Sequence, residues 1–340
     1  MRTRATKERG PERRFGAAPT ARPLPCGLMQ HRRLGQSGLS VSSLALGTMT
    51  WGNAVDVHEA SEHVRAFVDG GGTLIDTAFG YGGGAAETIL GTVLRETVSR
   101  EDVVVCTKAG ISRAGGQRRV DVSRRALMTQ LDASLARLGT DHVDVWLAHT
   151  WSDETPLAET LSALEWAVTT GRARYVGVSN YSGWQSARAV SLLEQARVPL
   201  VANEVEYSLV CRSAESEIAP AAAALGFGLL AWSPLARGVL TGKYRRGIPS
   251  GSRAASADFP RFAERFLDER SARIAEGVVI AAKGLDVSPT EVALAWVRDR
   301  PGVTAPIVGV RTLGQLRTAL ASQDLVLPEQ IVVALEDVSG

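Results

Sequence analysis

The feature that most constrains the fold is a regular alternation of short apolar runs and longer amphipathic segments between residues 44 and 310. Most of the short runs are continuously apolar, as expected for parallel strands that are buried on both faces. There are eight: LALGTM, TLIDTA, VVVCTKAG, VDVWLAH, YVGVSN, LVANEVEY, FGLLAWSP and TAPIVGV. Eight strand–helix units in roughly 300 residues predict an α/β fold, a (β/α)8 TIM barrel. A six-stranded doubly wound sheet is the alternative, and the number of runs disfavours it.

The segments between these runs carry the start and stop signals of helices. Ser123, Thr155 and Ser288 stand where N-caps are expected, and Glu291 would complete a capping box with Ser288. Upstream of the first strand, RRLGQSGLSVSSL predicts an N-terminal hairpin with QSG as its turn. The last periodic segment is an extra C-terminal helix beyond the eight units. Helices are predicted over residues 57–71, 123–139, 155–171, 288–300 and 327–339.

The charge distribution separates the first residues from the rest. The chain of 340 residues has a net charge of only +2, which argues against a nucleic-acid or membrane-surface partner. Residues 1–28 contain seven basic and two acidic residues, have no apolar periodicity, and lack the apolar stretch of a secretory signal. We expect them to form a disordered basic tail, with translation beginning at Met29 as the favoured interpretation and a transit peptide as the alternative. Residues 29–340 are then expected to form a single barrel domain.

The cysteines indicate neither a disulfide framework nor a metal site. Cys26, Cys106 and Cys211 are far apart in the sequence and form no CxxC pair. This usage is typical of a protein of the reducing cytoplasm. The chain also has no apolar run as long as a membrane span.

Polar side chains follow several of the predicted strands. Asp76 ends the second, Lys108 lies near the end of the third, His149 ends the fourth, and Tyr81 lies on the loop after Asp76. Each alone has an ordinary explanation: a helix cap, a surface lysine, a buried histidine or a packed tyrosine. In a barrel, however, the carboxyl ends of the strands share one mouth, so the four side chains converge there.

The chemistry of this group is consistent as a set. Tyrosine has a pKa of about 10, and a nearby buried ammonium is expected to lower it. A carboxylate such as Asp76 can hold Lys108 in its charged form, and His149 can orient a carbonyl oxygen by a hydrogen bond. The set therefore suits protonation of an oxygen that becomes negative when a hydride adds to a carbonyl. A Schiff-base aldolase that uses Lys108 is an alternative with less support.

The segment GYGGGA at residues 80–85 also matches the dinucleotide fingerprint G-x-G-x-x-G/A. It follows a strand and precedes a helix, as that motif requires. However, it belongs to the second unit, and the next strand ends in Lys108 instead of an acid. We therefore interpret these glycines as allowing a tight loop to carry Tyr81 over the barrel mouth.

The motifs LGTMTWG, DTAFGYG, CTKAG, LAH, VGVSN, WSPLARGVLTGKY and PIVGVRTLGQL occur in this order. Together they resemble the aldo-keto reductase family over nearly all of residues 29–340. Within that family the chain is similar to bacterial reductases related to potassium-channel β subunits. The resemblance implies a barrel that binds NADP(H) in extended form without a Rossmann domain. It also implies that Tyr81 is the proton donor, that Lys108 and Asp76 tune it, and that His149 orients the carbonyl.

The resemblance further implies three groups of cofactor contacts. The nicotinamide is expected to contact Ser179, Asn180, Glu204 and Trp232, and Gly47 and Thr48 are expected to contact the cofactor as well. The pyrophosphate loop comprises Ser233, Leu235, Arg237, Gly238 and Lys243. The adenosine end comprises Gly309, Arg311 and Gln315.

Two residues of this chain depart from the family pattern. Glu204 replaces a common glutamine, and Ala319 replaces a common asparagine at the adenine. An ionised glutamate only accepts hydrogen bonds, so its contact with the nicotinamide is expected to differ from that of glutamine.

The substrate is less constrained than the chemistry. Trp51, Trp151 and Tyr207 would line the substrate pocket and favour a bulky or planar molecule, although core packing explains these aromatic residues equally well. We expect an NADPH-dependent reductase of an aldehyde or ketone. The alternatives are a nucleotide-deoxysugar reductase of the same fold and a slow, redox-sensing NADP(H)-binding module.

Overall fold

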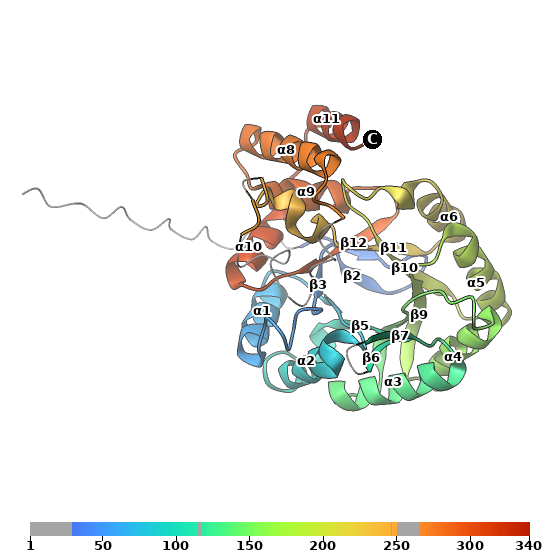
Figure 1. Cartoon of the computed structure of the whole chain (residues 1–340). Coiled ribbons are helices and arrows are strands. Elements are labelled where there is room, and N and C mark those ends of the chain that lie inside the picture. The colour runs from blue at the N-terminus through green and yellow to red at the C-terminus, as the bar shows by residue number, and fades with distance from the viewer. Residues whose placement is uncertain (1–28, 115–116, 246, 250–264) are drawn as a thin grey trace, which may run out of the picture.

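The computed structural model describes residues 29–114, 117–245, 247–249 and 265–340, and a closed barrel of eight parallel strands lies at its centre (Figure 1). The basic tail predicted for residues 1–28 lies outside the described residues. Each of the eight predicted runs coincides with one barrel strand to within two residues at its start, which confirms the (β/α)8 prediction. The strands are β3 (Ala45–Gly47), β4 (Leu74–Asp76), β5 (Val104–Ala109), β8 (Val143–Ala148), β9 (Ala173–Ser179), β10 (Leu200–Glu206), β11 (Gly228–Trp232) and β12 (Val303–Gly309).

Helices surround the barrel, and the five predicted from sequence are all present (Figure 1). Ser123 caps its helix as expected, and Ser288 and Glu291 form the predicted capping box. The cap predicted at Thr155 is wrong: that helix begins at Leu157, with the extended Pro156 in the cap position and no side-chain bond. The helices are α1 (Val57–Asp69), α2 (Ala85–Glu96), α3 (Arg124–Leu138), α4 (Leu157–Thr169), α5 (Gly183–Gln195), α6 (Ile218–Leu225), α8 (Glu269–Gly284), α9 (Pro289–Arg298), α10 (Leu313–Ala321) and α11 (Glu329–Ser339).

The buried apolar side chains form two layers. The larger cluster joins the outer faces of the strands to the helices and includes Leu46, Ile75, Trp146 and Val178. The smaller cluster consists of strand and hairpin residues and fills the interior of the barrel. It comprises Leu34, Val41, Ala45, Leu74, Cys106, Val145, Leu147, Val201, Ala202, Leu230, Ala305 and Ile307. The interior is therefore a packed core and not an open channel.

Two hairpins lie outside the barrel sheet. The predicted hairpin pairs β1 (His31–Arg33) with β2 (Ser40–Ser42). Its turn lies so close to the backbone at the start of β10 and β11 that only glycine fits at position 35. The second pairs β6 (Ile111–Ala114) with β7 (Gln117–Val120) and directly follows β5, at the opposite end of the barrel. The sequence analysis missed it. Among the described helices, none is both long and apolar enough to cross a bilayer.

Candidate active site

Three buried ionisable side chains lie inside the barrel, just above its apolar core. Side chains alternate along a strand, so Asp76 shares the inward face of Leu74, and Lys108 shares that of Cys106. Glu204 reaches the same layer from β10. The exposed fractions of Asp76, Lys108 and Glu204 are 3%, 0% and 2%. All three lie in the second half of their strands, and Asp76 ends its strand. They therefore face the mouth of the barrel.

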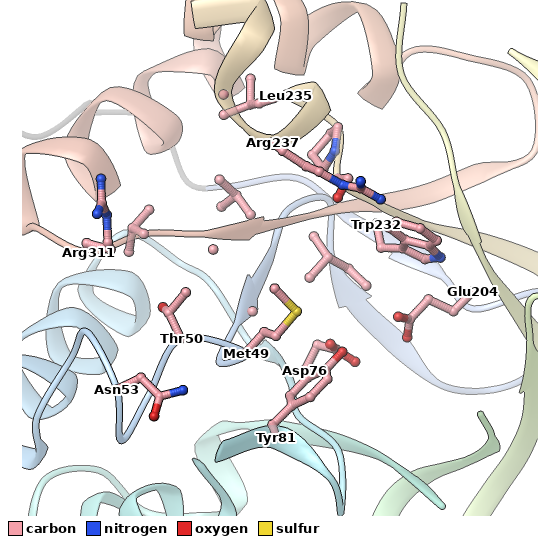
Figure 2. Close-up of a pocket in the computed structure, with 18 of the residues that line it drawn as sticks. Met49, Thr50, Asn53, Asp76, Tyr81, Glu204, Trp232, Leu235, Arg237 and Arg311 are labelled. Carbon is pink, nitrogen blue, oxygen red and sulfur yellow. The ribbon is translucent and has the colours of Figure 1, made fainter. Parts of the chain in front are cut away.

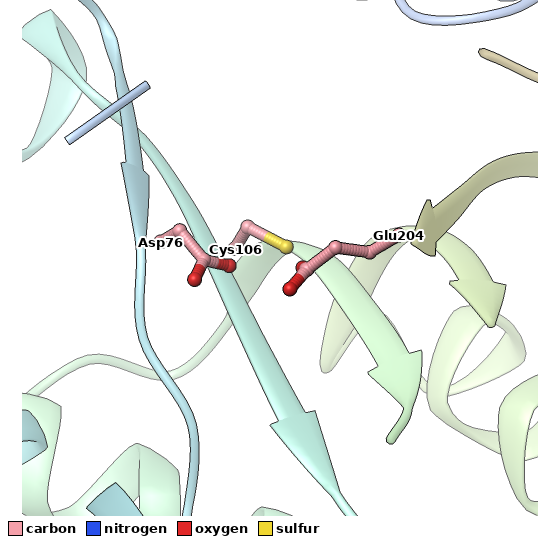
Figure 3. A group of neighbouring side chains, drawn as sticks. All are labelled: Asp76, Cys106 and Glu204. Carbon is pink, nitrogen blue, oxygen red and sulfur yellow. The ribbon is translucent and has the colours of Figure 1, made fainter. Parts of the chain in front are cut away.

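Lys108 joins the two carboxylates. Its Nζ donates to Asp76 Oδ1 and lies 2.8 Å from Glu204 Oε2. Figure 3 shows Asp76 and Glu204 approaching each other from different strands, with the Cys106 thiol beside them. The ligand atoms of these three residues lie within 4.8 Å of one another, a spacing that could hold a metal ion. The lysine ammonium already bonds both carboxylates, however, and burial raises the pKa of the Cys106 thiol well above its usual range. We therefore interpret the cluster as an ammonium site.

The pKa values of this cluster follow from burial and from the two acids. Burial alone would lower the pKa of Lys108, but Asp76 and Glu204 outweigh it and raise that pKa well above the usual value. Burial, assisted by the charge of Asp76, raises the pKa of Glu204 to about 8. At neutral pH Glu204 therefore retains a proton and can donate a hydrogen bond. This corrects the expectation that the residue only accepts, because that expectation assumed an ionised side chain.

Crowding around its glycines fixes the loop that carries Tyr81. A side chain at Gly80 would meet the carbonyl oxygen of Ile111 at 2.6 Å, and one at Gly84 would meet the Arg137 guanidinium at 2.5 Å. Arg137 also donates to the carbonyl oxygen of Phe79 at 3.0 Å and pairs with the buried Glu87 at 3.0 Å. Glycine at these positions lets the loop approach its neighbours closely, as the sequence suggested.

Tyr81 and His149 face each other at the barrel mouth. Their rings meet edge to face at 6.0 Å, and Lys108 Nζ lies 5.5 Å from the centre of the tyrosine ring. Burial raises the pKa of Tyr81 above its usual value, although the Lys108 ammonium opposes this effect. The expectation of a net lowering is therefore wrong for this state, because desolvation of the phenolate outweighs the attraction of the ammonium. Burial, followed by the charges of Lys108 and Arg118, lowers the pKa of His149 well below its usual value, so the imidazole is neutral at neutral pH.

A cavity of about 720 Å³ opens above this group. Figure 2 shows Asp76, Tyr81 and Glu204 gathered on one side of it, whereas Arg311 lies on the far side beyond Met49 and Thr50. Among the residues predicted to contact the cofactor, all but Thr48 line the cavity. The ones that do are Gly47, Ser179, Asn180, Glu204, Trp232, Ser233, Leu235, Arg237, Gly238, Lys243, Gly309, Arg311 and Gln315.

A hydrogen-bond chain holds one wall of the cavity. Trp232 Nε1 donates to Asn180 Oδ1 at 3.0 Å, and Asn180 Nδ2 donates to Ser179 Oγ at 2.9 Å and to the His149 carbonyl at 3.1 Å. Ser179 Oγ in turn donates to the Glu204 carbonyl at 2.9 Å. Trp232 is thereby held in one orientation as a flat surface on the wall of the cavity.

The loop after β11 has the features of an anion site. Ser233, Ala236, Arg237 and Gly238 all have positive φ values, between 46° and 95°. Consecutive positive φ angles of this kind produce concave backbone surfaces that bind anions. A side chain at Gly238 would meet Lys243 Nζ at 2.5 Å, so the lysine ammonium lies directly over the loop. The described part of this loop therefore fits the pyrophosphate of a dinucleotide.

Arg237 plays a more structural part than its assignment suggested. It is buried, pairs with Glu206 at 3.1 Å and lies 6.0 Å from the Trp232 ring centre. At the far end of the cavity, Gln315 Oε1 accepts from the Arg311 backbone at 2.9 Å, which fixes the turn into α10. Ala319 is fully buried.

The structure places the three predicted pocket aromatics outside the cavity lining. Trp51 is fully buried in the outer core layer, and Tyr207 packs on Trp296 and donates to Glu215 at 2.7 Å. Trp151 packs between Tyr181 and Trp184 and donates to Asp153. Thr48 is also fully buried and does not line the cavity. Sequence alone could not separate these packing roles from a pocket.

Several cavity residues were missed. Most are small or polar side chains with no distinctive motif, but Arg113 and Arg118 lie on the unpredicted hairpin of β6 and β7. The sequence ISRAGGQRRV could have predicted this hairpin, because two adjacent glycines separate two short segments that can form strands. The other missed lining residues include Met49, Thr50, Asn53, Thr241, Thr290 and Thr318.

Comparison with known proteins identifies the family of the chain. A sequence profile described as the aldo/keto reductase family matches residues 43–339. The chain belongs to the aldo/keto reductase family. This aldo/keto reductase is 38% identical over 320 residues to a probable voltage-gated potassium channel subunit beta of Oryza sativa subsp. japonica, covering 91% of the chain and 96% of that protein. It is 35% identical over 320 residues to the uncharacterized oxidoreductase YrpG of Bacillus subtilis, covering 91% and 96%. It is also 35% identical over 307 residues to L-glyceraldehyde 3-phosphate reductase of Escherichia coli (strain K12), covering 87% and 88%.

Proposed function

We propose that this protein reduces an aldehyde or ketone to an alcohol with NADPH, and that Tyr81 donates the proton. The observation that carries the proposal is the meeting of Tyr81, neutral His149 and the buried Lys108–Asp76 pair at one end of the cavity. NADPH, when bound, supplies the hydride that adds to the carbonyl carbon. The residues that would hold it line the rest of the cavity: Trp232 beside the nicotinamide, the loop after β11 at the pyrophosphate, and Arg311 near the adenosine.

The protein side chains would manage the oxygen of the carbonyl. His149 is neutral, so one ring nitrogen carries a hydrogen that can bond the oxygen and hold it near Tyr81. Tyr81 keeps its proton at neutral pH because its pKa is raised, so it is present in the donor form. As negative charge develops on the substrate oxygen, the phenolic proton moves to it, and Lys108 stabilises the phenolate that remains. Asp76 and Glu204 hold the Lys108 ammonium in place throughout.

The test removes only the proton. Tyr81→Phe should keep NADPH binding, measured by fluorescence titration, while lowering steady-state turnover of a simple aldehyde by roughly 10²-fold or more. Tyr175→Phe is the matched control, because Tyr175 on β9 is a partly buried tyrosine whose hydroxyl lies near Gly38 in the N-terminal hairpin. Near-normal turnover in Tyr81→Phe would contradict the assignment.

The similarity to proteins named as potassium-channel β subunits favours a second candidate, a slow NADP(H)-binding module that senses redox state. Both candidates require a bound dinucleotide and differ in the rate of the chemical step. Single-turnover oxidation of bound NADPH by a panel of aldehydes, ketones, quinones and keto-sugars separates them. Turnover much slower than once per second with every substrate, together with tight cofactor binding, would support the module.

A further inference from the structure

The hairpin of β6 and β7 places two arginines on the wall of the catalytic cavity. Arg113 on β6 and Arg118 on β7 are directly paired in the hairpin register, so their side chains leave from the same face. Both line the cavity, as does Ile111, two residues before Arg113. Ser112 and Arg119, the alternate pair, do not. The period of the strands therefore gives the hairpin a cationic face toward the cavity.

This face lies beside the catalytic group. The hairpin directly follows β5, the strand that carries Lys108, and the carbonyl of Ile111 packs on Gly80, next to Tyr81. The charge of Arg118 acts on His149, whose pKa it helps to lower. The two arginines therefore lie close to Tyr81 and His149, the side chains that would bind the substrate carbonyl.

No acid among the described residues neutralises the charge of the pair. Among the described residues, no carboxylate forms an ion pair with Arg113 or Arg118. The acids that line the cavity are Asp76 and Glu204, and both bond Lys108. A cleft whose fixed charges are of one sign concentrates ligands of the opposite sign.

The cofactor leaves this pair available. The other cations of the cavity are Arg237 and Lys243 on the loop after β11 and Arg311 after β12. In the proposed function Lys243 and Arg311, together with the backbone of the loop after β11, account for the anionic parts of the dinucleotide, while Arg237 pairs with Glu206. A second set of cations beside Tyr81 is then explained by charge on the substrate itself.

We propose that Arg113 and Arg118 form an anion subsite, and that the preferred substrate is an aldehyde or ketone that also carries a carboxylate or phosphate group. This inference rests on the proposed function and assigns the substrate class of the same site. A guanidinium bonds either anion with two parallel hydrogen bonds, so the shared chemistry is an oxyanion. The carbonyl would lie at Tyr81 and His149, with the anionic group toward the hairpin.

The kinetic test compares matched neutral and anionic substrates: benzaldehyde with para-carboxybenzaldehyde, and glyceraldehyde with glyceraldehyde 3-phosphate. We expect the anionic member to have the higher kcat/KM, and the advantage to shrink with added salt. Arg113→Gln and Arg118→Gln should each lower kcat/KM for the anionic member by about threefold to tenfold, mainly through KM. The neutral member should change by less than about twofold. The substrate pair whose anionic member has the larger advantage in kcat/KM shows whether carboxylate or phosphate is the preferred group.

Arg119→Gln is the matched control, since it removes the same charge from the other face of the hairpin. An equal loss in Arg119→Gln, or equal losses for neutral and anionic substrates, would overturn the subsite. A loss of NADPH affinity in Arg113→Gln or Arg118→Gln would also overturn it, because the arginines would then belong to the cofactor site.

A second readout does not need turnover. Calorimetric binding of benzoate and of phenyl phosphate to the NADP+-loaded protein should weaken by the same threefold to tenfold in each cavity-facing variant, whereas benzyl alcohol binding should not. If no aldehyde is reduced but these anions bind and respond to both arginines, the proposed function fails and the subsite stands. If aldehydes are reduced but neither anion responds, the subsite alone is wrong.

Discussion

The protonated state of Glu204 leads to a prediction about stability. In the folded chain burial and Asp76 raise the pKa of this carboxyl from 4.5 to about 8. In the unfolded chain the carboxyl loses its proton near its usual value. Unfolding between these two pH values therefore releases a proton, and the free energy of unfolding falls as the pH rises. At about 1.4 kcal/mol per pKa unit, this one group lowers the free energy of unfolding by about 5 kcal/mol in total, of which about 4 kcal/mol is lost between pH 5 and 8.5.

Glu204→Gln removes this titration and keeps the size of the side chain. Below pH 5 the variant and the unmodified chain should differ by no more than about 1 kcal/mol, since the amide oxygen can still accept from Lys108. As the pH rises to 8.5, the variant should become more stable relative to the unmodified chain by up to about 4 kcal/mol. Urea unfolding, followed by circular dichroism at half-unit pH steps, measures this difference directly.

A neighbouring variant separates the charge effect from loss of packing. Val205→Ala removes apolar volume from the same strand without changing any charge, so its stability should differ from that of the unmodified chain by a constant amount at every pH. If the difference for Glu204→Gln is also constant between pH 5 and 8.5, then Glu204 is ionised in the folded chain and the reasoning is refuted.

Three further substitutions test other parts of the site. Lys108→Met should leave the buried Asp76 carboxylate without its cation and lower the free energy of unfolding by about 3–5 kcal/mol, measured by urea unfolding. A stability loss below about 1 kcal/mol would contradict the ammonium-site interpretation. Arg311→Ala should weaken NADPH binding about tenfold to a hundredfold in fluorescence titrations and leave the NADH dissociation constant almost unchanged. The reason is that a charged hydrogen bond to the 2′-phosphate contributes about 1.5–3 kcal/mol. Equal weakening of both cofactors would show that Arg311 has a structural role. Arg137→Met should leave the buried Glu87 without its cation, bonded only by Thr107, and should therefore lower stability by about 3 kcal/mol. It should also reduce turnover without changing the NADPH dissociation constant; full activity would show that the Tyr81 loop holds itself in place.

The positions of Asp76, Lys108 and His149 were predictable because strand ends are visible in the sequence. Each follows or ends a continuous apolar run, and a parallel barrel directs the carboxyl ends of all its strands to one mouth. The two-residue period then indicates which side chains face inward. These inferences need only local pattern and the topology of the barrel.

The contact between Lys108 and Glu204 was not predictable in the same way. Their strands, β5 and β10, are not neighbours in the barrel, since β8 and β9 lie between them. The contact therefore crosses the interior, and it depends on how the closed barrel brings opposite strands together. The protonation of Glu204 follows from that contact and from burial, so the sequence analysis treated the residue as an ordinary ionised acid.

For the aromatic residues, the sequence analysis predicted a pocket position that the structure does not show. Trp51 and Tyr207 have the composition of pocket residues, but the first fills the space between barrel and helices and the second is bonded to Glu215. A large side chain near a strand end can point either inward to the mouth or outward to a helix. A shift of one residue along the loop changes the side chain from inward to outward, and the pattern of a single sequence does not locate loop residues to within one position.

The position of Lys108 between Asp76 and Glu204 constrains how the proposed chemistry can be lost during evolution. Replacement of the lysine alone would leave Asp76 and Glu204 facing each other without a cation, so a viable change at that position requires others at the same time. Tyr81 carries no such structural charge, and one base change converts a tyrosine codon to phenylalanine. A lineage that kept the barrel for cofactor sensing would therefore lose the tyrosine hydroxyl first and the lysine last. A conserved lysine in a relative is thus weak support for turnover, whereas the tyrosine is the informative residue.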